Sequence, residues 1–392
     1  MTPSARVQAA IEILDQVIAS ARNDGPPADA IVQRYFKTRR YAGSKDRRAV
    51  RELVFRAIRR NGEQPESGRS AMLGLAQDDN YFVGQFDGSP HGPAPRSPDE
   101  IAAAASLVPA WVQPLLSDLV SPDEWPALLE RASLDLRVNA ARTTREEMLQ
   151  SFDDAEPTQL SPWGLRLEPD TKIDQHPAFV DGLIEVQDEG SQLIGLACDP
   201  NDAMHILGLC AGAGGKSLAL AAAAPKAEII ASDTNRARLA QLPGRAERAG
   251  TAIAARLIDG GREATQLADL AGQCDLVLVD APCSGSGTWR RNPEGRWRLT
   301  TERLERLVKL QQRLLDIAAP LVKPGGALVY ATCSIIRAEG ADQARDFLGR
   351  HSSWSVQDVP FDGGRADGPG RLLTPAHDAT DGFFVARFAK PC

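Results

Sequence analysis

The first sixty residues carry apolar side chains every three or four positions, which is the spacing of one buried helix face. Three runs have this spacing: 7–18, 31–36 and 49–57. The next stretch, 61–100, is rich in Gly, Pro, Ser and Asp, which predicts a loop. Beyond it, 107–120 and 124–132 predict two short helices. Residues 1–133 therefore predict an all-helical domain with a loop-rich stretch.

A different pattern begins at Leu134. A strand-like run, a helix and further short strands predict a small α+β subdomain at 134–185. Over 186–392, apolar strands alternate with helices. The predicted strands are 205–209, 228–232, 254–257, 275–280, 326–332 and 382–388, and the longest predicted helix is 301–321. This alternation predicts an α/β domain with a parallel, doubly wound sheet of the Rossmann-like type.

Two of these strands end beside groups that can react. The strand at 275–280 ends in Asp280, and Cys283 follows on a turn that contains Pro and Gly. The strand at 326–332 is followed directly by Cys333. Because open α/β sheets bind ligands at the carboxyl ends of their strands, we expect a carboxylate and two thiols at the functional edge.

A glycine-rich loop follows the first predicted strand of this domain, from Leu209 to Ser217. Glycines let a ligand approach the backbone, and the next helix offers free amides. The loop fits neither a P-loop nor a dinucleotide fingerprint, because Cys210 and Ser217 stand where those motifs need glycine. The next two strands are followed by Asp233 and Asp259. Either acid could cap a helix, but together with the loop they favour a cofactor that contains adenosine.

The composition, with 43% hydrophobic and 25% charged residues, is that of an ordinary globular protein, and no apolar run is long enough for a membrane helix. The chain lacks a secretory signal pattern, and its six cysteines form no CxxC pair, so we expect a reducing cytoplasm and no metal. The net charge is −7. However, residues 34–60 hold eleven Lys or Arg against two acids, and 290–309 hold seven against three. One such stripe could be a solvated helix face, but two favour RNA or DNA as partner.

Two thiols beside such a cofactor suit a particular reaction. C5 of cytosine is a poor nucleophile, but attack of a thiolate at C6 turns the ring into an enamine whose C5 can accept a methyl group. A carboxylate at the pyrimidine edge would stabilise the protonated N3 that forms. The alternative is that the cysteines are buried small apolar residues, the usual role of a free thiol. We expect that role for the four cysteines away from the two strand ends: Cys198, Cys210, Cys274 and Cys392.

The motifs around these residues resemble those of the RsmB/NSUN family of S-adenosylmethionine-dependent RNA cytosine-C5 methyltransferases. The similar segments are VQDEGSQ (186–192), CAGAGGK (210–216), DAPCS (280–284), TCS (332–334) and DGFF (381–384). They stand in the family's order over 134–388, more than half of the chain. The pair of cysteine motifs is highly specific.

The resemblance implies four catalytic residues. Cys333 would attack C6 of the target cytosine, and Cys283 would assist release of the methylated RNA from the covalent adduct. Asp280 would contact the cytosine, and Lys216 would lie near the reaction centre.

The resemblance also implies S-adenosylmethionine as cofactor. Asp233 would bind its ribose, Asp259 its adenine, and the loop at 210–216 its methionine end. The implied cofactor-binding residues are Leu209, Cys210, Ala211, Gly212, Ala213, Gly214, Gly215, Lys216, Asp233, Arg238, Asp259, Gly260 and Asp280.

Residues 1–60 resemble, in helix pattern and basic charge, the NusB-like RNA-binding domain of rRNA-modifying members of this family. This resemblance favours small-subunit (16S) rRNA as the substrate, and it implies a cytoplasmic, monomeric enzyme with no membrane or metal partner. Two alternatives stay open: a tRNA cytosine-C5 methyltransferase, and a non-catalytic RNA-binding ribosome-assembly factor that has kept the fold.

Overall fold

The computed structural model describes all 392 residues, and the chain forms two compact units. The first, which we call the helical unit, comprises Met1–Leu116, Trp125–Glu130 and Thr288–Thr301. The second, the sheet unit, comprises Ser117–Glu124, Arg131–Gly287 and Glu302–Cys392. Two short segments therefore leave the unit of their sequence neighbours: 117–124 belongs to the sheet unit, and 288–301 belongs to the helical unit.

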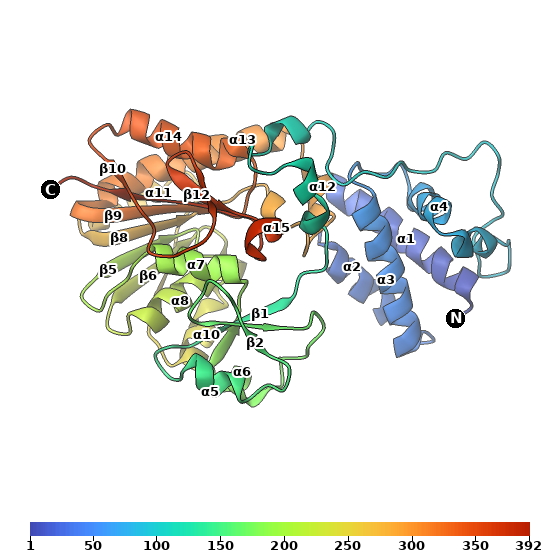
Figure 1. Cartoon of the computed structure of the whole chain (residues 1–392), viewed down its shortest axis with the longest axis horizontal. Coiled ribbons are helices and arrows are strands. Elements are labelled where there is room, and N and C mark those ends of the chain that lie inside the picture. The colour runs from blue at the N-terminus through green and yellow to red at the C-terminus, as the bar shows by residue number, and fades with distance from the viewer. The chain divides into compact units, whose positions relative to one another are not determined.

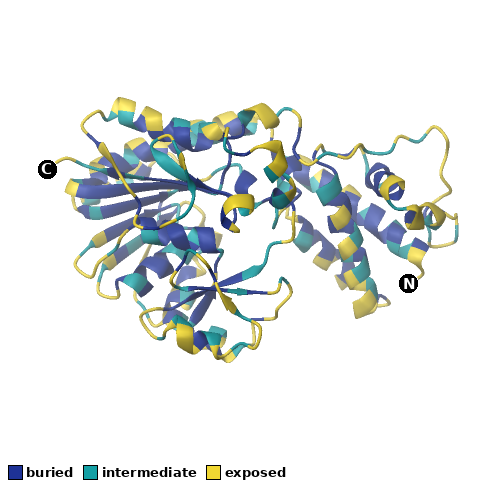
Figure 2. Cartoon of the chain, in the orientation of Figure 1, coloured by how far each residue is buried: buried dark blue, intermediate teal, exposed yellow.

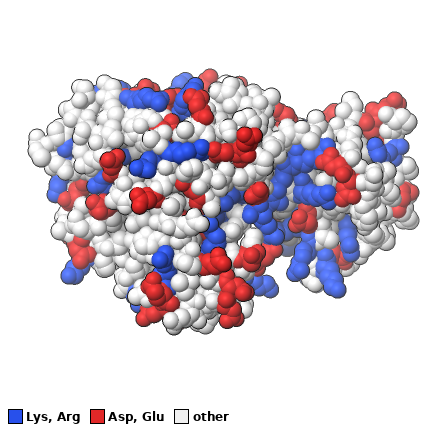
Figure 3. All heavy atoms as spheres, in the orientation of Figure 1, with Lys and Arg blue, Asp and Glu red and all other residues white.

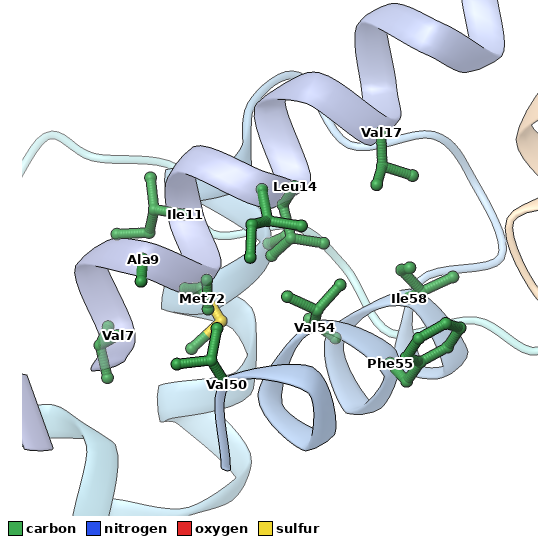
Figure 4. Packing of buried hydrophobic residues seen from close by; sticks show 14 of the residues in the cluster. Val7, Ala9, Ile11, Leu14, Val17, Val50, Val54, Phe55, Ile58 and Met72 are labelled. Carbon is green, nitrogen blue, oxygen red and sulfur yellow. The ribbon is translucent and has the colours of Figure 1, made fainter. Parts of the chain in front are cut away.

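Three long helices confirm the helical runs predicted over the first sixty residues, and a fourth follows. They are α1 (Pro3–Arg22), α2 (Ala28–Lys37), α3 (Ser44–Arg60) and α4 (Gly68–Asp78). The hydroxyl of Thr2 caps α1 by accepting a hydrogen bond from the amide of Ala5 at 3.2 Å. Figure 4 shows the apolar face of α1 packed on α3 and α4 through Val7, Ile11, Leu14, Val17, Val50, Val54, Ile58 and Met72. The likeness of this unit to NusB stays a prediction.

The prediction of a loop over 61–100 is wrong in part, because α4 and the 3-10 helix η1 (Asn80–Gln85) form there. Ser67 and Ser70 form a capping box at the start of α4, each hydroxyl accepting the other's backbone amide at 3.1 Å. The helix then buries Met72 in the core shared with α1. The apolar segment is short and its flanks are rich in Gly and Pro, so the composition of 61–100 as a whole indicated a loop.

The two helices predicted at 107–120 and 124–132 do not form as α-helices. The chain makes only single 3-10 turns there: η2 (Gln113–Leu115), η3 (Pro122–Glu124) and η4 (Pro126–Leu128). A proline lacks the amide proton of the helical hydrogen bond and clashes with the preceding turn. Apolar residues at helical spacing therefore do not form an α-helix where prolines interrupt them. Three prolines interrupt these segments, Pro109, Pro114 and Pro126, and Pro122 lies between them.

The segment 288–301 belongs to the core of the helical unit although it begins directly after the Cys283 turn. It contains the short helix α12 (Gly295–Arg298). The Trp297 side chain is 6% exposed within the core formed by α1 to α4, and its Nε1 donates to the carbonyl of Asn61 at 2.8 Å.

Arg296 belongs to the second basic stripe of the sequence, but its side chain is buried and stabilises the fold. Its guanidinium is 1% exposed and donates to the carbonyls of Leu107 and Ile58, both at 2.6 Å. Burial lowers the pKa of Arg296 to about 9. The prediction that this stripe faces a nucleic acid is therefore wrong for Arg296.

The main sheet of the sheet unit has nine strands. In the spatial order β11-β12-β13-β9-β8-β5-β6-β7, with β10 also paired to β13, they are β5 (His205–Leu209), β6 (Glu228–Asp233), β7 (Ala254–Leu257), β8 (Cys274–Asp280), β9 (Val322–Thr332), β10 (Ser355–Gln357), β11 (Arg365–Asp367), β12 (Gly370–Leu373) and β13 (Phe383–Ala389). The strands β5 to β9 pair in parallel, as predicted. The prediction of a parallel sheet fails beyond β9, because β10 to β13 pair antiparallel and make the sheet mixed.

Helices cover both faces of this sheet. They are α7 (Glu189–Ala197), α8 (Gly215–Ala223), α9 (Arg236–Leu239), α10 (Leu242–Ala249), α11 (Glu263–Gln266), α13 (Thr301–Ala318), α14 (Ala341–Arg350) and α15 (Pro375–Asp378), with the 3-10 helices η5 (Ala268–Leu270), η6 (Ser286–Thr288), η7 (Ala319–Leu321) and η8 (Arg337–Glu339). In Figure 1, α7, α8 and α10 lie on one side of the sheet and α13 and α14 on the other, as right-handed crossovers in opposite directions require. Figure 2 shows the central strands buried between them. None of the helices combines the length and hydrophobicity that a membrane span needs.

A second, smaller sheet precedes the main one in the chain. Its four antiparallel strands, in the order β2-β3-β1-β4, are β1 (Leu134–Val138), β2 (Glu156–Pro157), β3 (Gly164–Leu167) and β4 (Ile184–Val186), accompanied by α5 (Arg145–Leu149) and α6 (Pro177–Val180). Leu136, Leu165 and Ile184 are buried between these elements and give this α+β segment a small core of its own.

We predict that Trp297→Ala destabilises the helical unit by about 3–5 kcal/mol, since it leaves a cavity in the core and removes the bond to Asn61. The measurement is denaturant unfolding followed by circular dichroism. Trp111→Ala, at a half-buried position of the same unit, is the control and should cost clearly less. Equal losses for the two variants would contradict a core role for Trp297.

Candidate active site

The parallel pairing of β8 with β9 brings two reactive turns together. Asp280, the last residue of β8, lies opposite Ala331 in the register, two residues before Cys333. Both strands end at this edge, and the thiols of Cys283 and Cys333 come within 3.3 Å, Sγ to Sγ. Both cysteines are partly exposed. The structure thus brings together the two thiols that the sequence placed at strand ends.

Backbone and hydroxyl hydrogen bonds join the two turns beyond the thiols. The amide of Gly287 donates to the carbonyl of Cys333 at 3.0 Å. The hydroxyls of Ser286 and Ser334 lie 3.0 Å apart, and the Ser286 hydroxyl also accepts the amide of Ile335 at 3.0 Å. The turns therefore form one hydrogen-bonded structure.

A buried carboxylate lies beneath both turns. Glu339 is 0% exposed and accepts hydrogen bonds from the amide of Ser284 at 2.8 Å and the hydroxyl of Ser334 at 2.6 Å. The side-chain amide of Gln311, from α13, donates to Glu339 at 3.0 Å and to the carbonyl of Pro282 at 2.9 Å. The sequence prediction assigned no role to Glu339 or Gln311. Gln311 is a single polar position on a long helix, so no spacing in the sequence singles it out. Glu339 follows Cys333 by six residues, but its partners on both turns become visible only in the fold.

An ion pair lies beside the thiols. Lys216, at the start of α8, donates from Nζ to Oδ2 of Asp280 at 2.8 Å. Its ammonium also lies 5.5 Å from the centre of the Phe383 ring. Burial alone would lower the pKa of Lys216, but the charge and hydrogen bond of Asp280 outweigh it and raise that pKa.

The two thiols have different surroundings. The hydrogen bond to Cys333, burial, the charge of Cys333 and, after these, the negative charge of Glu339 raise the pKa of Cys283 well above its usual range. Cys283 is therefore a protonated thiol at neutral pH, able to donate to the sulfur of Cys333.

The glycine-rich loop follows β5 and ends in α8. Gly212 and Gly214 have φ of +58° and +82°, a left-handed region that strains residues with a Cβ. A side chain at Gly212 would also approach the guanidinium of Arg238 to 2.6 Å. The carbonyl of Ala213 accepts a hydrogen bond from Arg245 at 2.7 Å. The loop is thus held in a tight turn with its amides near the strand ends.

Asp233, at the end of β6, braces this loop. One carboxylate oxygen accepts the amide of Gly212 at 2.7 Å and the other accepts the amide of Asn235 at 2.6 Å. Each carboxylate oxygen has two acceptor positions, so one remains on each for a ligand. Asp233 is 7% exposed, so only a ligand that lies directly on the loop can reach its carboxylate.

The remaining predicted cofactor residues lie around the same strand ends. Asp259 is exposed beyond β7, where its carboxylate accepts from the side-chain amide of Gln266 at 3.1 Å. Gly260 beside it has no neighbouring atom where a Cβ would stand. The side chain of Leu209 is buried in the sheet, so only its backbone can face a ligand.

The other four cysteines are structural or peripheral. Cys198 and Cys274 are buried, and burial raises the pKa of Cys198 to about 12 and that of Cys274 to about 11. Cys210 is partly buried, and burial raises its pKa to about 12. Cys392 is exposed, so the prediction that it is a buried apolar residue is wrong. No group of three or more His, Cys, Asp or Glu side chains is arranged to hold a metal ion.

Known structures share this fold. The crystal structure of PH0851 aligns with 100% of this chain and 99% of its own at a TM-score of 0.75 and 24% identity. NSun6 from Pyrococcus horikoshii aligns with 71% of this chain and 96% of its own at a TM-score of 0.63 and 19% identity. At these identities the likeness shows a common fold only.

Sequence comparison identifies the family. Residues 195–389 match the model of the 16S rRNA methyltransferase RsmB/F family. Ribosomal RNA small subunit methyltransferase B of Salmonella paratyphi B is 34% identical over 295 residues, which are 73% of this chain and 67% of that protein. Its counterpart in Salmonella arizonae is 35% identical over the same shares. Identity at this level over most of both chains shows that the protein belongs to the RsmB/F family and is an RNA methyltransferase, as its motifs predicted.

Proposed function

We propose that the protein transfers a methyl group from S-adenosylmethionine to C5 of a cytosine in small-subunit (16S) rRNA, through a covalent bond between Cys333 and C6. The observation that carries this proposal is the pair of partly exposed thiols of Cys283 and Cys333, 3.3 Å apart at the strand ends. The ion pair of Lys216 and Asp280 lies at the end of the same strand as Cys283. The substrate follows the relatives named above, which are small-subunit rRNA methyltransferases.

The residues around the glycine-rich loop fit S-adenosylmethionine. The positive φ angles at Gly212 and Gly214 open the loop to close approach of a ligand, and Asp233 keeps an acceptor position on each oxygen for the ribose hydroxyls. Asp259 would contact the adenine. NSun6 from Pyrococcus horikoshii was solved with SFG, an analogue of S-adenosylmethionine. When bound, the cofactor supplies an electrophilic methyl group.

Cys333 is the nucleophile in this proposal. Its sulfur bonds to C6 of the cytosine, which places electron density on C5, and C5 then takes the methyl group. Asp280 holds the pyrimidine edge and stabilises the protonated N3 by its negative charge. Lys216 fixes the carboxylate of Asp280 through the 2.8 Å ion pair and so orients it toward the base.

Cys283 acts after methyl transfer. While Cys333 attacks, Cys283 is a thiol that donates to the neighbouring sulfur, so only one of the two cysteines is a nucleophile. Once C5 carries the methyl group, β-elimination completes the reaction: water takes the proton from C5, the C5–C6 double bond re-forms, and the sulfur of Cys333 leaves C6 as a thiolate. The Cys283 thiol lies 3.3 Å from that sulfur and assists its release by donating a hydrogen bond to the departing thiolate.

The RNA contact lies on the helical unit, at the corner where α2 meets α3. Several arginines of the first basic stripe are held by acids: Arg51 by Asp29, and Arg56 by Asp79. Six cations at this corner are exposed and have no acidic partner: Arg34, Lys37, Arg40, Lys45, Arg47 and Arg48. Figure 3 shows Lys and Arg side chains gathered over this part of the unit.

An aromatic side chain lies among these cations. Tyr41 is 73% exposed and directly follows Arg40 in the chain. Unpaired cations bind phosphates and an exposed aromatic ring stacks on unpaired bases, so this corner has the two features that RNA recognition uses.

For the chemistry, we predict that the wild-type protein transfers label from S-adenosylmethionine to cytosine of deproteinised small-subunit rRNA. Cys333→Ala loses activity by a factor on the order of a thousand or more, because it removes the nucleophile. Cys283→Ala accumulates a protein–RNA adduct that survives a denaturing gel. Cys274→Ala, at a buried cysteine outside the site, is the matched control and should keep wild-type activity.

Other outcomes decide between the alternatives. Labelling of tRNA without rRNA would keep the two-thiol chemistry and replace the substrate. Absence of cofactor binding and of labelling on every RNA would favour a non-catalytic assembly factor.

For the RNA contact, we predict that Arg40→Ala/Arg48→Ala weakens binding of small-subunit rRNA fragments and reduces the slope of log K against log salt by roughly one to two. Arg51→Ala/Arg56→Ala removes the same charge from cations that are already paired with acids and is the matched control. The measurement is a binding titration at several salt concentrations. Equal weakening by both pairs would show that net charge, and not this corner, governs binding.

A further inference from the structure

The carboxylate of Glu339 is buried without a cation beside it. It is 0% exposed, and its four hydrogen-bond donors are neutral: the amide and hydroxyl of Ser284, the hydroxyl of Ser334 and the side-chain amide of Gln311. Charges buried in proteins are usually paired with an opposite charge, since desolvation is otherwise costly. Four neutral donors, three of them on the two reactive turns, therefore hold this buried carboxylate in place.

The donors of Glu339 come from both reactive turns. Ser284 directly follows Cys283, and Ser334 directly follows Cys333. Glu339 bonds to Ser284 at 2.8 Å from the amide and 2.5 Å from the hydroxyl, and to Ser334 at 2.6 Å. One side chain thus holds the residue next to each thiol.

The position of Glu339 is itself fixed by β9. Its backbone carbonyl accepts hydrogen bonds from the Tyr330 hydroxyl at 2.7 Å and from the Thr332 hydroxyl at 3.3 Å. Both side chains are fully buried, so they do not exchange these bonds for water. The carboxylate is therefore held rigidly relative to the strand that ends at Cys333.

We propose that Glu339 is the positioning residue of the two-thiol site: it clamps the turns of Cys283 and Cys333 at their reactive separation and determines which of the two thiols attacks the base. This inference rests on the proposed function for its catalytic meaning. The clamp and its charge can be tested in the protein without RNA.

Electrostatics supports the second part of this role. The charge of Glu339 is one of the causes that raise the pKa of Cys283, together with the hydrogen bond to Cys333 and burial. A negative charge disfavours a second anion nearby, so the thiolate of Cys283 is suppressed. Cys333 then attacks the base with a protonated neighbour, and the two thiols do not compete for C6.

The experiment uses two variants of Glu339, one that removes the charge of the side chain and one that shortens the side chain. Glu339→Gln keeps the length of the side chain and can keep its contacts, because hydroxyls accept as well as donate, but it removes the charge. Glu339→Asp keeps the charge and is too short to bridge both turns. Asp342→Asn makes the same change from acid to amide at a surface ion pair of α14 and is the matched control.

The first measurement is the pH dependence of Cys283 alkylation in RNA-free protein, followed by mass spectrometry. Glu339→Gln should alkylate Cys283 several-fold faster than wild type at a pH where thiolate is scarce, because removal of the negative charge lowers the pKa of Cys283. Asp342→Asn should keep the wild-type profile. An unchanged profile in folded Glu339→Gln protein would overturn the electrostatic role.

The second measurement is steady-state methyl transfer. Glu339→Asp should lower kcat by about ten- to a hundredfold with little change in KM for RNA, because misplacement of a reacting group by about 1 Å has effects of this size. Unchanged kcat would overturn the positioning role. Should Glu339→Asp fail to fold, Ser334→Ala removes one arm of the clamp and should show the same loss of kcat. If wild type transfers no methyl group at all, the proposed function fails while the alkylation result still decides the role of Glu339.

Discussion

The parallel pairing of β8 with β9 determines where the chemistry of this protein can occur. The register places Asp280 opposite Ala331, so the chain leaves both strands at one edge and the two cysteine turns meet there. β8 lies between β5 and β9, and its residues from Leu276 to Val279 are apolar and buried with Asp275 and Asp280 on either side, so a slip by one residue would move a carboxylate into the core. Core packing therefore sets the separation of the thiols.

The helical unit is linked to this edge through the chain itself. Directly beyond Gly287 the polypeptide enters the core of the helical unit, where Trp297 and Arg296 are buried among its helices. A protein that lost residues 1–116 would leave both side chains without their partners Asn61 and Leu107. The helical unit is for this reason a folding partner of the segment after Cys283, in addition to its proposed contact with RNA.

The sequence predicted the features that depend on local pattern. The apolar runs gave β5 and β7 at their observed ends, and the strand-end position of Cys283 and Cys333 followed from β8 and β9. It failed for α4, whose flanks are rich in Gly and Pro, and for the strands β10, β11 and β12, which are too short to show a period. The role of Glu339 was also out of reach, because it depends on which turns meet above it in the fold.

The carboxylates of Asp280 and Glu339 both lie near the thiols, but only one of them is paired with a cation. This difference bears on the roles proposed for the two carboxylates. Asp280 is paired with Lys216, so a cation balances its charge. Glu339 has only neutral donors, and its charge is one of the causes that raise the pKa of Cys283. In the proposed mechanism, a cation beside Glu339 would favour the thiolate of Cys283, and both cysteines would then compete for C6. The proposed division between one nucleophile and one protonated neighbour therefore depends on the neutral surroundings of Glu339.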